Sequence, residues 1–119
     1  MAMRNYLHAL RKIVLIAMAG FVICAFALGS LMVTNSAGVR AGITGIVYNK
    51  SANSIGVDYV VVDPVGTNVT KFMIQSSLDL QTWTNLTPTI TLTGSGSGEA
   101  SDFASPQAKF YRMYLVNFQ

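Results

Sequence analysis

Five carboxylates are the side chains whose type and number suggest chemistry in this chain: Asp58, Asp63, Asp79, Glu99 and Asp102. A pair of them, suitably spaced, would serve as acid and base in glycoside hydrolysis. Each of the five stands in or beside an expected turn or strand edge, where Asp is a common turn former. Turn formation and solvation therefore explain them better than catalysis. No Asp-x-Asp-x-Asp loop is present, so we expect no calcium site.

Histidine and cysteine chemistry is limited by number and by position. The only histidine is His8 and the only cysteine is Cys24. Residues 34–119 therefore lack the histidine or cysteine that a histidine-based triad or a His/Cys zinc site requires. Residues 94–98 (GSGSG) are not followed by a lysine and a helix, so we expect a flexible turn rather than a phosphate loop. The sequence predicts no enzyme, no metal and no cofactor.

A basic leader and an apolar run precede this part of the chain. Residues 1–12 carry Arg4, Arg11 and Lys12 and no acidic residue, and residues 13–33 carry no charge. As a helix, those 21 residues would span about 31 Å, close to the hydrocarbon thickness of a bilayer. Positive charge is retained on the cytoplasmic side. We therefore expect a transmembrane helix over residues 13–33 after a cytoplasmic leader.

A cleaved signal peptide is the alternative to this anchor. Small residues suit cleavage after residues 25–27 (Ala-Phe-Ala) or after residues 39–41 (Val-Arg-Ala). The apolar run continues past the first of these sites, which favours a retained anchor. Cleavage would instead give a secreted product.

Two features inside the apolar run bear on helix packing and on lipid modification. Ala25 and Gly29 form a small-xxx-small pair that would let this helix pack against another helix. Cys24 follows Ile23, which is not the small residue that lipid modification requires, so we expect an unmodified apolar side chain.

The remainder of the chain predicts a mainly β protein, a small antiparallel β-sandwich. Residues 34–42, rich in small and polar types, are expected to form a linker, and residues 43–119 the sandwich. Short β-rich stretches alternate with turn residues, and no helical period is sustained. The expected strands cover residues 43–48, 57–62, 69–76, 83–86, 89–93 and 109–116. Without disulfides, so small a core would gain from a strand donated by a partner or from packing in an assembly.

Alternation along the strands selects the core, since successive side chains point to opposite faces. The expected core consists of Phe72, Ile74, Trp83, Leu86, Tyr111, Met113 and Leu115. Trp83, the largest of these, is expected to close one end of the core. A ligand-stacking role for this indole is the alternative.

Two stretches of the second half resemble part of a fibronectin type III-like module, and most nearly the small repeats of large secreted bacterial proteins. They are residues 72–86 (FMIQSSLDLQTWTNL) and 110–117 (FYRMYLVN). The positions that match are Ser77, Asp79, Leu80, Trp83, Thr84, Leu86, Phe110, Tyr111 and Arg112. The resemblance implies a structural, adhesive or spacer role and a Tyr111 that tethers a loop through its hydroxyl. Residues 42–70 depart from the first two strands of the family.

The function we expect is a non-enzymatic, membrane-anchored structural or interaction protein that displays an extracytoplasmic β-sandwich, as an accessory subunit of a membrane or envelope assembly. Its partners would be the lipid bilayer and other protein subunits or copies of itself. A self-assembling filament or virion subunit and a secreted surface- or glycan-binding module are the alternatives. Charges cancel over residues 34–119, so nucleic acid is not an expected partner.

Overall fold

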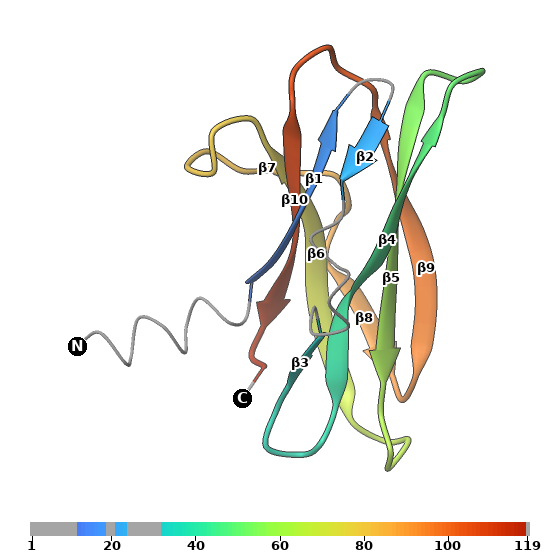
Figure 1. The fold of residues 1–119 in the computed structure, drawn as a ribbon. Helices are drawn as coiled ribbons and strands as arrows, with labels where there is room; N and C mark the ends of the chain where they lie inside the picture. Colours follow the sequence, from blue (N-terminus) through green and yellow to red (C-terminus); the bar gives the residue numbers. More distant parts are fainter. Residues whose placement is uncertain (1–11, 19–20, 24–31, 119) are drawn as a thin grey trace.

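Two antiparallel β-sheets make up the fold, and they pack face to face (Figure 1). The computed structural model describes residues 12–18, 21–23 and 32–118. Every regular element among these residues is a strand, which agrees with the predicted mainly β class. No helix in the described part is long and apolar enough to cross a membrane.

The first sheet has the strand order β3-β4-β5-β9. Its strands are β3 (Met32–Thr34), β4 (Arg40–Asn49), β5 (Ser54–Val62) and β9 (Gly96–Phe103). The β4–β5 hairpin is rich in valine and isoleucine, which favour strands. Its register shifts between Ile43 and Gly45, so that Thr44 is an extra residue in β4.

The second sheet has the order β2-β1-β10-β6-β7, with β8 also paired to β6. Its strands are β1 (Lys12–Met18), β2 (Phe21–Ile23), β6 (Val69–Ser77), β7 (Thr84–Asn85), β8 (Ile90–Thr93) and β10 (Lys109–Val116). The β10–β6 pairing joins the two stretches that carry the fibronectin-like resemblance. The sheet therefore brings residues 72–86 beside residues 110–117.

The core lies between the two sheets and follows the alternation of the strands. Phe72, Ile74, Tyr111 and Met113 are fully buried, and Leu115 is buried. They meet inward residues of the other sheet: Val39, Ala41, Ile43, Ile46, Ile55, Val57, Val61 and Ala100. Leu86 is partly buried and packs against this core. Trp83 is not among the core residues.

The predicted helix over residues 13–33 differs from what the structure has in the described part of that run. Residues 13–18 and 21–23 lie in β1 and β2, and residues 32–33 lie in β3. Five of the nine residues at positions 13–18 and 21–23 are β-branched, and a short continuous apolar run suits a paired strand as well as a helix. Its other residues, including Ala25 and Gly29, lie outside the described residues.

The expected turn over residues 94–98 is shorter than predicted. Gly94 and Ser95 connect β8 to β9, but residues 96–98 already pair with β5. A Cβ atom at Gly98 would collide with the hydroxyl group of Tyr59, whose ring packs edge-to-face on Phe72 (centroids 5.1 Å apart). Glycine is needed here because the tyrosine ring approaches the strand closely. The expected linker is also shorter, because β4 begins at Arg40.

Candidate functional site

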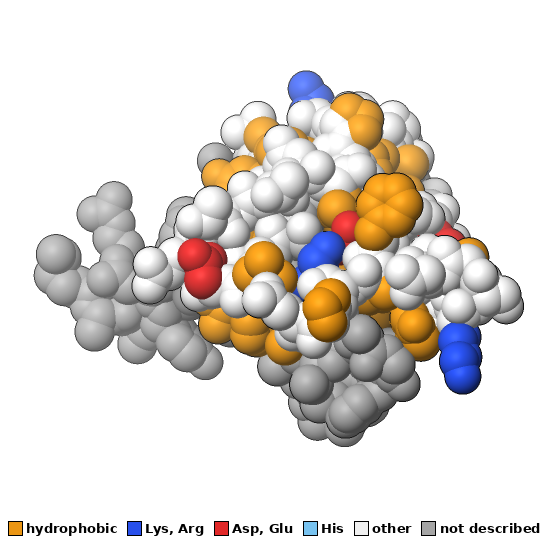
Figure 2. Space-filling view, turned by 90° about the horizontal axis from the view of Figure 1, so that it is seen from above, with side chains coloured by type: hydrophobic (Ala, Val, Ile, Leu, Met, Phe, Trp, Pro, Cys, Tyr) orange, Lys and Arg blue, Asp and Glu red, His pale blue; other side chains and the backbone are white. Residues whose placement is uncertain are grey.

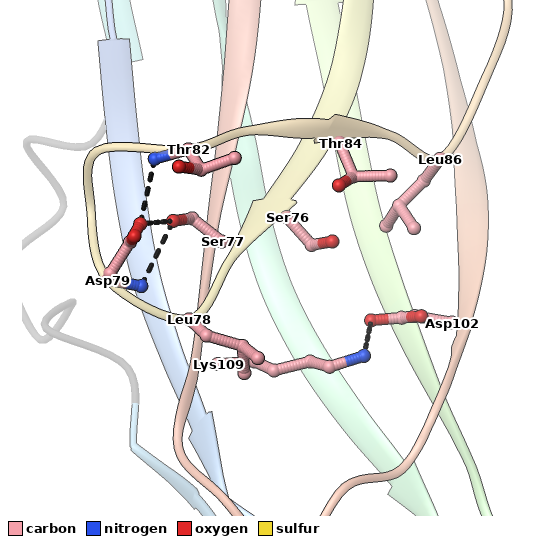
Figure 3. A pocket seen from close by; sticks show the side chains of 9 residues that line it. All are labelled: Ser76, Ser77, Leu78, Asp79, Thr82, Thr84, Leu86, Asp102 and Lys109. Atoms are coloured by element: carbon pink, nitrogen blue, oxygen red, sulfur yellow. Dashed lines mark hydrogen bonds and ion pairs between the residues drawn. The ribbon is translucent and has the colours of Figure 1, made fainter.

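A hollow of about 490 Å³ opens at one end of the sandwich, and the polar and charged side chains in its lining make it the candidate functional site. It lies between the end of β6, the connection that follows β6, and the facing ends of β9 and β10 (Figure 3). The lining residues are Ser76, Ser77, Leu78, Asp79, Thr82, Thr84, Leu86, Asp102 and Lys109. Figure 3 shows Ser76, Thr84 and Leu86 facing a shared space beside the Lys109–Asp102 pair.

One wall of the hollow is a loop that is folded around Asp79. Its Oδ1 accepts hydrogen bonds from the backbone N–H groups of Gln81 (2.8 Å) and Thr82 (2.7 Å). The Ser77 hydroxyl donates to the same oxygen (3.0 Å) and accepts from the Leu80 N–H (2.9 Å). The hydrogen bonds from Thr82, Gln81 and Ser77 hold the pKa of Asp79 below its ordinary value. Asp79 therefore organises the wall as a turn former, as the sequence predicts.

Two of the lining residues, Asp102 and Lys109, form a polar cluster with the buried Tyr111. Asp102 Oδ2 accepts a hydrogen bond from the Tyr111 hydroxyl (2.8 Å) and pairs with Lys109 Nζ (2.8 Å). The side chains of Asp102 and Lys109 are 9% and 17% exposed. Lys109 Nζ also donates to the backbone oxygen of Phe103 (3.3 Å). Tyr111 thus ties β10 to the end of β9; the resemblance implies a tether to a loop, whereas Asp102 belongs to a strand.

Burial and the neighbouring carboxylate of Asp102 raise the pKa of Tyr111 well above its ordinary value. The unfolded phenol ionises near pH 10, whereas the folded phenol stays neutral at that pH. The free energy of unfolding should therefore fall as pH rises above about 10, by up to about 1.4 kcal/mol per pH unit. Tyr111→Phe should lack this part of the alkaline slope in thermal denaturation between pH 8 and 11.5. Parallel slopes for the two proteins would contradict the prediction.

Exposed apolar side chains surround this polar hollow. Leu78 and Leu80 of the loop are 54% and 50% exposed, and Phe103, next to Asp102, is 82% exposed. Leu80 also has a positive φ of 64°, which is unfavourable for a leucine. Figure 2, which looks onto this end, shows orange side chains around a central blue one with a red one beside it. Large apolar side chains therefore stay exposed at the same end of the sandwich as the Asp102–Lys109 pair.

Trp83 lies on the outer surface of the β10 sheet, beside Arg112, rather than at one end of the core. The Arg112 guanidinium carbon is 4.1 Å from the centroid of the Trp83 ring and 5.3 Å from that of Tyr114. Arg112 Nε donates to Oε1 of Gln75 (2.6 Å), and Gln75 Nε2 donates to Oδ1 of Asn85 (2.7 Å). A cation covers one face of the indole, so the expected end-plug role is not observed.

The other carboxylates lie apart from the hollow. Asp63 is buried at the β5–β6 connection, where it accepts hydrogen bonds from the N–H groups of Val65 (3.0 Å) and Asn68 (2.8 Å). Asp58 and Glu99 stand directly opposite each other on β5 and β9. Within the described part of the chain, no group of three or more His, Cys, Asp or Glu side chains could hold a metal ion.

The Asp58–Glu99 pair leads to a pH-dependent prediction. A hydrogen bond to Asp58 and the charge of that carboxylate raise the pKa of Glu99. The pair is therefore most favourable at acidic pH and becomes repulsive as pH rises through the raised pKa. Glu99→Gln should raise Tm by a few degrees at pH 7 and leave it unchanged near pH 3.5. Thermal denaturation at both pH values checks this, and an equal shift at both would contradict it.

Sequence reasoning missed the cluster of Asp102, Lys109 and Tyr111 as a unit. It treated Asp102 as a turn residue and Tyr111 as core, and it assigned no role to Lys109. The only available signal was the resemblance, which implies a tethering hydroxyl at Tyr111. The partner of that hydroxyl stands nine residues earlier, on the opposite sheet.

Comparison with known proteins finds no protein similar to this chain. No protein-family model, no curated protein and no solved structure matches this chain. The fibronectin type III-like resemblance of residues 72–86 and 110–117 thus stays a prediction from those residues alone.

Proposed function

We propose that this chain is a non-enzymatic interaction protein that presents a β-sandwich on the outer side of a membrane and contacts its partner through the hollow end of that sandwich. The observation that carries the proposal is the exposed apolar rim around the polar cluster. Leu78, Leu80 and Phe103 expose half or more of their surface at this one end. Large apolar side chains that stay exposed at one end of a protein support a protein–protein contact site there.

The membrane part of the proposal rests on the leader and the apolar run. Residues 1–12 are basic and residues 13–33 are uncharged, which favours a cytoplasmic leader and an exported head. Signal cleavage after residue 27 would export residues 32–118 as part of a secreted protein, whereas cleavage after residue 41 would also remove the buried Val39 and Ala41. The fibronectin-like resemblance, with its adhesive or spacer roles, supports an extracytoplasmic position.

Cysteine labelling of intact cells tests the orientation. In a Cys24→Ala background, Ser51→Cys places a thiol in the exposed β4–β5 turn, and Asn5→Cys places one in the leader. A maleimide that cannot cross membranes should label position 51 in intact cells and position 5 only after lysis. Labelling of position 5 alone, or of neither position before lysis, would overturn the orientation.

Photo-crosslinking tests the contact surface. A benzophenone side chain at position 103 should form adducts of defined mass with a partner in native envelopes. Val65 is the matched control, because it is 65% exposed in the β5–β6 connection at the other end of the sandwich (Figure 1). Equal adduct yields at positions 103 and 65, or none at either, would count against a contact surface at the hollow.

A glycan-binding role is the second candidate, and the lining of the hollow favours it. Hydroxyl groups of Ser76, Thr82 and Thr84 line the same hollow as Lys109, a set that suits a polyhydroxylated ligand. Titration with a panel of neutral and acidic monosaccharides, followed by NMR of the amide groups, would show shifts confined to residues 76–84 and 102–109. Shifts spread over the whole surface, or none, would reject this candidate.

A further inference from the structure

Among the described strands, β1 pairs with one edge of β10, and most of β1 belongs to the apolar run of residues 13–33. β1 pairs antiparallel with β10 from Lys12 opposite Tyr114 to Ala17 opposite Lys109. The other edge of β10 pairs with β6. β1 therefore closes a sheet edge that would otherwise present free N–H and C=O groups.

The placement of residues 13–18 in β1 excludes their placement in a membrane. A bilayer-spanning helix needs about 20 residues, and the apolar run supplies 21 only if residues 13–18 are included. Signal cleavage after residue 27 would remove the same residues, and cleavage after residue 41 would also remove β3 and the first two residues of β4. The exported head that our proposed function describes, on which this inference rests, therefore has an open β10 edge.

The residues of β10 make that edge complementary to a second copy of itself. A two-fold axis through Met113 pairs the strand antiparallel with its copy and keeps both inner faces on one side. Tyr111 then stands opposite Leu115 on the buried face. On the outer face Arg112 stands opposite Tyr114, and Phe110 stands opposite Val116. Each pair is apolar or cation–aromatic.

One of the two nearest alternative registers is unfavourable. An axis through Arg112 would place two guanidinium groups directly opposite each other, which is destabilising across strands. The charges of β10 do not otherwise protect its edge, since Lys109 is held by Asp102 and Arg112 lies over Trp83. The strand contains no proline.

From these observations we propose that the exported head pairs with a second copy of this chain through antiparallel β10–β10 contact centred on Met113, which joins the two β10–β6 sheets into one. The dimer uses the edge that Lys12–Met18 leaves when it enters the membrane or is cleaved. The contact lies along the side of the sandwich, so the hollow end of each copy stays open.

Disulfide trapping in native membranes tests the contact and its register. The full chain carries Cys24→Ala in every case. Phe110→Cys with Val116→Cys should give a disulfide-linked dimer in most of the protein on a non-reducing gel. Six residues along one strand separate these positions by about 20 Å, so no bond within a chain competes. Either single substitution should give no dimer, because position 110 faces position 116 and not itself.

A second pair of cysteine substitutions tests whether β1 is paired with β10. Ile16 stands opposite Phe110 when β1 occupies the edge, so Ile16→Cys with Phe110→Cys would then close a bond within one chain. We expect no such bond in the membrane-bound or cleaved protein. That bond, dimers from the single variants, or no dimer from the double variant would overturn the proposal.

Two measurements distinguish an absent β10–β10 contact from an absent membrane anchor. The unsubstituted chain in mild detergent should have twice the 12.8 kDa protein mass by light scattering, and a monomer would overturn the proposal without reliance on any variant. An uncleaved chain found in the aqueous fraction would instead refute the anchor in the proposed function.

Discussion

Asp102→Ala is expected to lower the free energy of unfolding by about 3–5 kcal/mol, a large part of the stability of so small a domain. The substitution leaves the Lys109 ammonium, whose side chain is 17% exposed, without its carboxylate. It also leaves the fully buried Tyr111 without an acceptor for its hydroxyl. Breaking a buried ion pair from one side is costly because the remaining charge stays desolvated. Urea denaturation of the two proteins measures the difference.

Glu99→Ala is the matched control for this prediction. Glu99 is a carboxylate on the same strand, but it is exposed and faces Asp58 rather than a cation. We expect its removal to leave the urea midpoint at neutral pH unchanged or slightly raised. Equal losses for the two variants would show that the polar cluster has no special role.

Phe72→Ala is expected to cost about 3–5 kcal/mol, the usual range for removing a buried aromatic ring. Phe72 is fully buried between the sheets and packs edge-to-face on Tyr59 at an interplanar angle of 66°. Its loss leaves a cavity at the centre of the core and removes the ring contact of Tyr59. Urea denaturation and amide exchange of β5 and β6 both check this effect.

Phe103→Ala provides the control of the same residue type. Phe103 is 82% exposed, so its removal should change stability by less than about 0.5 kcal/mol. If Phe103 serves at the contact surface, this variant should keep its fold and lose binding. A large loss of stability at position 103 would mean that the ring is packed in solution.

These contrasts separate the residues that hold the sandwich together from those available for contact. The cluster of Asp102, Lys109 and Tyr111 ties β9 to β10, and two of its members, Asp102 and Lys109, also line the hollow. Asp102 therefore suits a test of stability, whereas the rim residues suit a test of binding. The β10 edge is a third and independent surface, along the side of the sandwich.

Much of the β architecture could be predicted from local pattern. The last strand is observed over the predicted residues 109–116, and alternation along it places Tyr111, Met113 and Leu115 inward. Val and Ile in the β4–β5 hairpin and the turn residues after each strand are local signals of the same kind. Period-two alternation requires only neighbouring residues, so it can be read without knowledge of the partners.

Strand β9 and the position of Trp83 could not be predicted in this way. A glycine- and serine-rich stretch has low strand preference, and residues 96–103 become a strand through pairing with β5, which lies about forty residues earlier. Trp83 is held outside the core by Arg112, twenty-nine residues later in the chain. Both results depend on contacts between distant segments.

The amino-acid sequence by itself determined the β class, the inward face of the last strand, the separation of a basic apolar N-terminal segment from a charge-balanced remainder, and the scarcity of histidine and cysteine. The tertiary structure alone decided that Asp102, Lys109 and Tyr111 meet, that Trp83 lies under a guanidinium group, and that residues 12–18 close the edge of β10. The physical reason is that composition and periodicity act along the chain, whereas ion pairs, stacking and sheet edges depend on which segments the fold brings together.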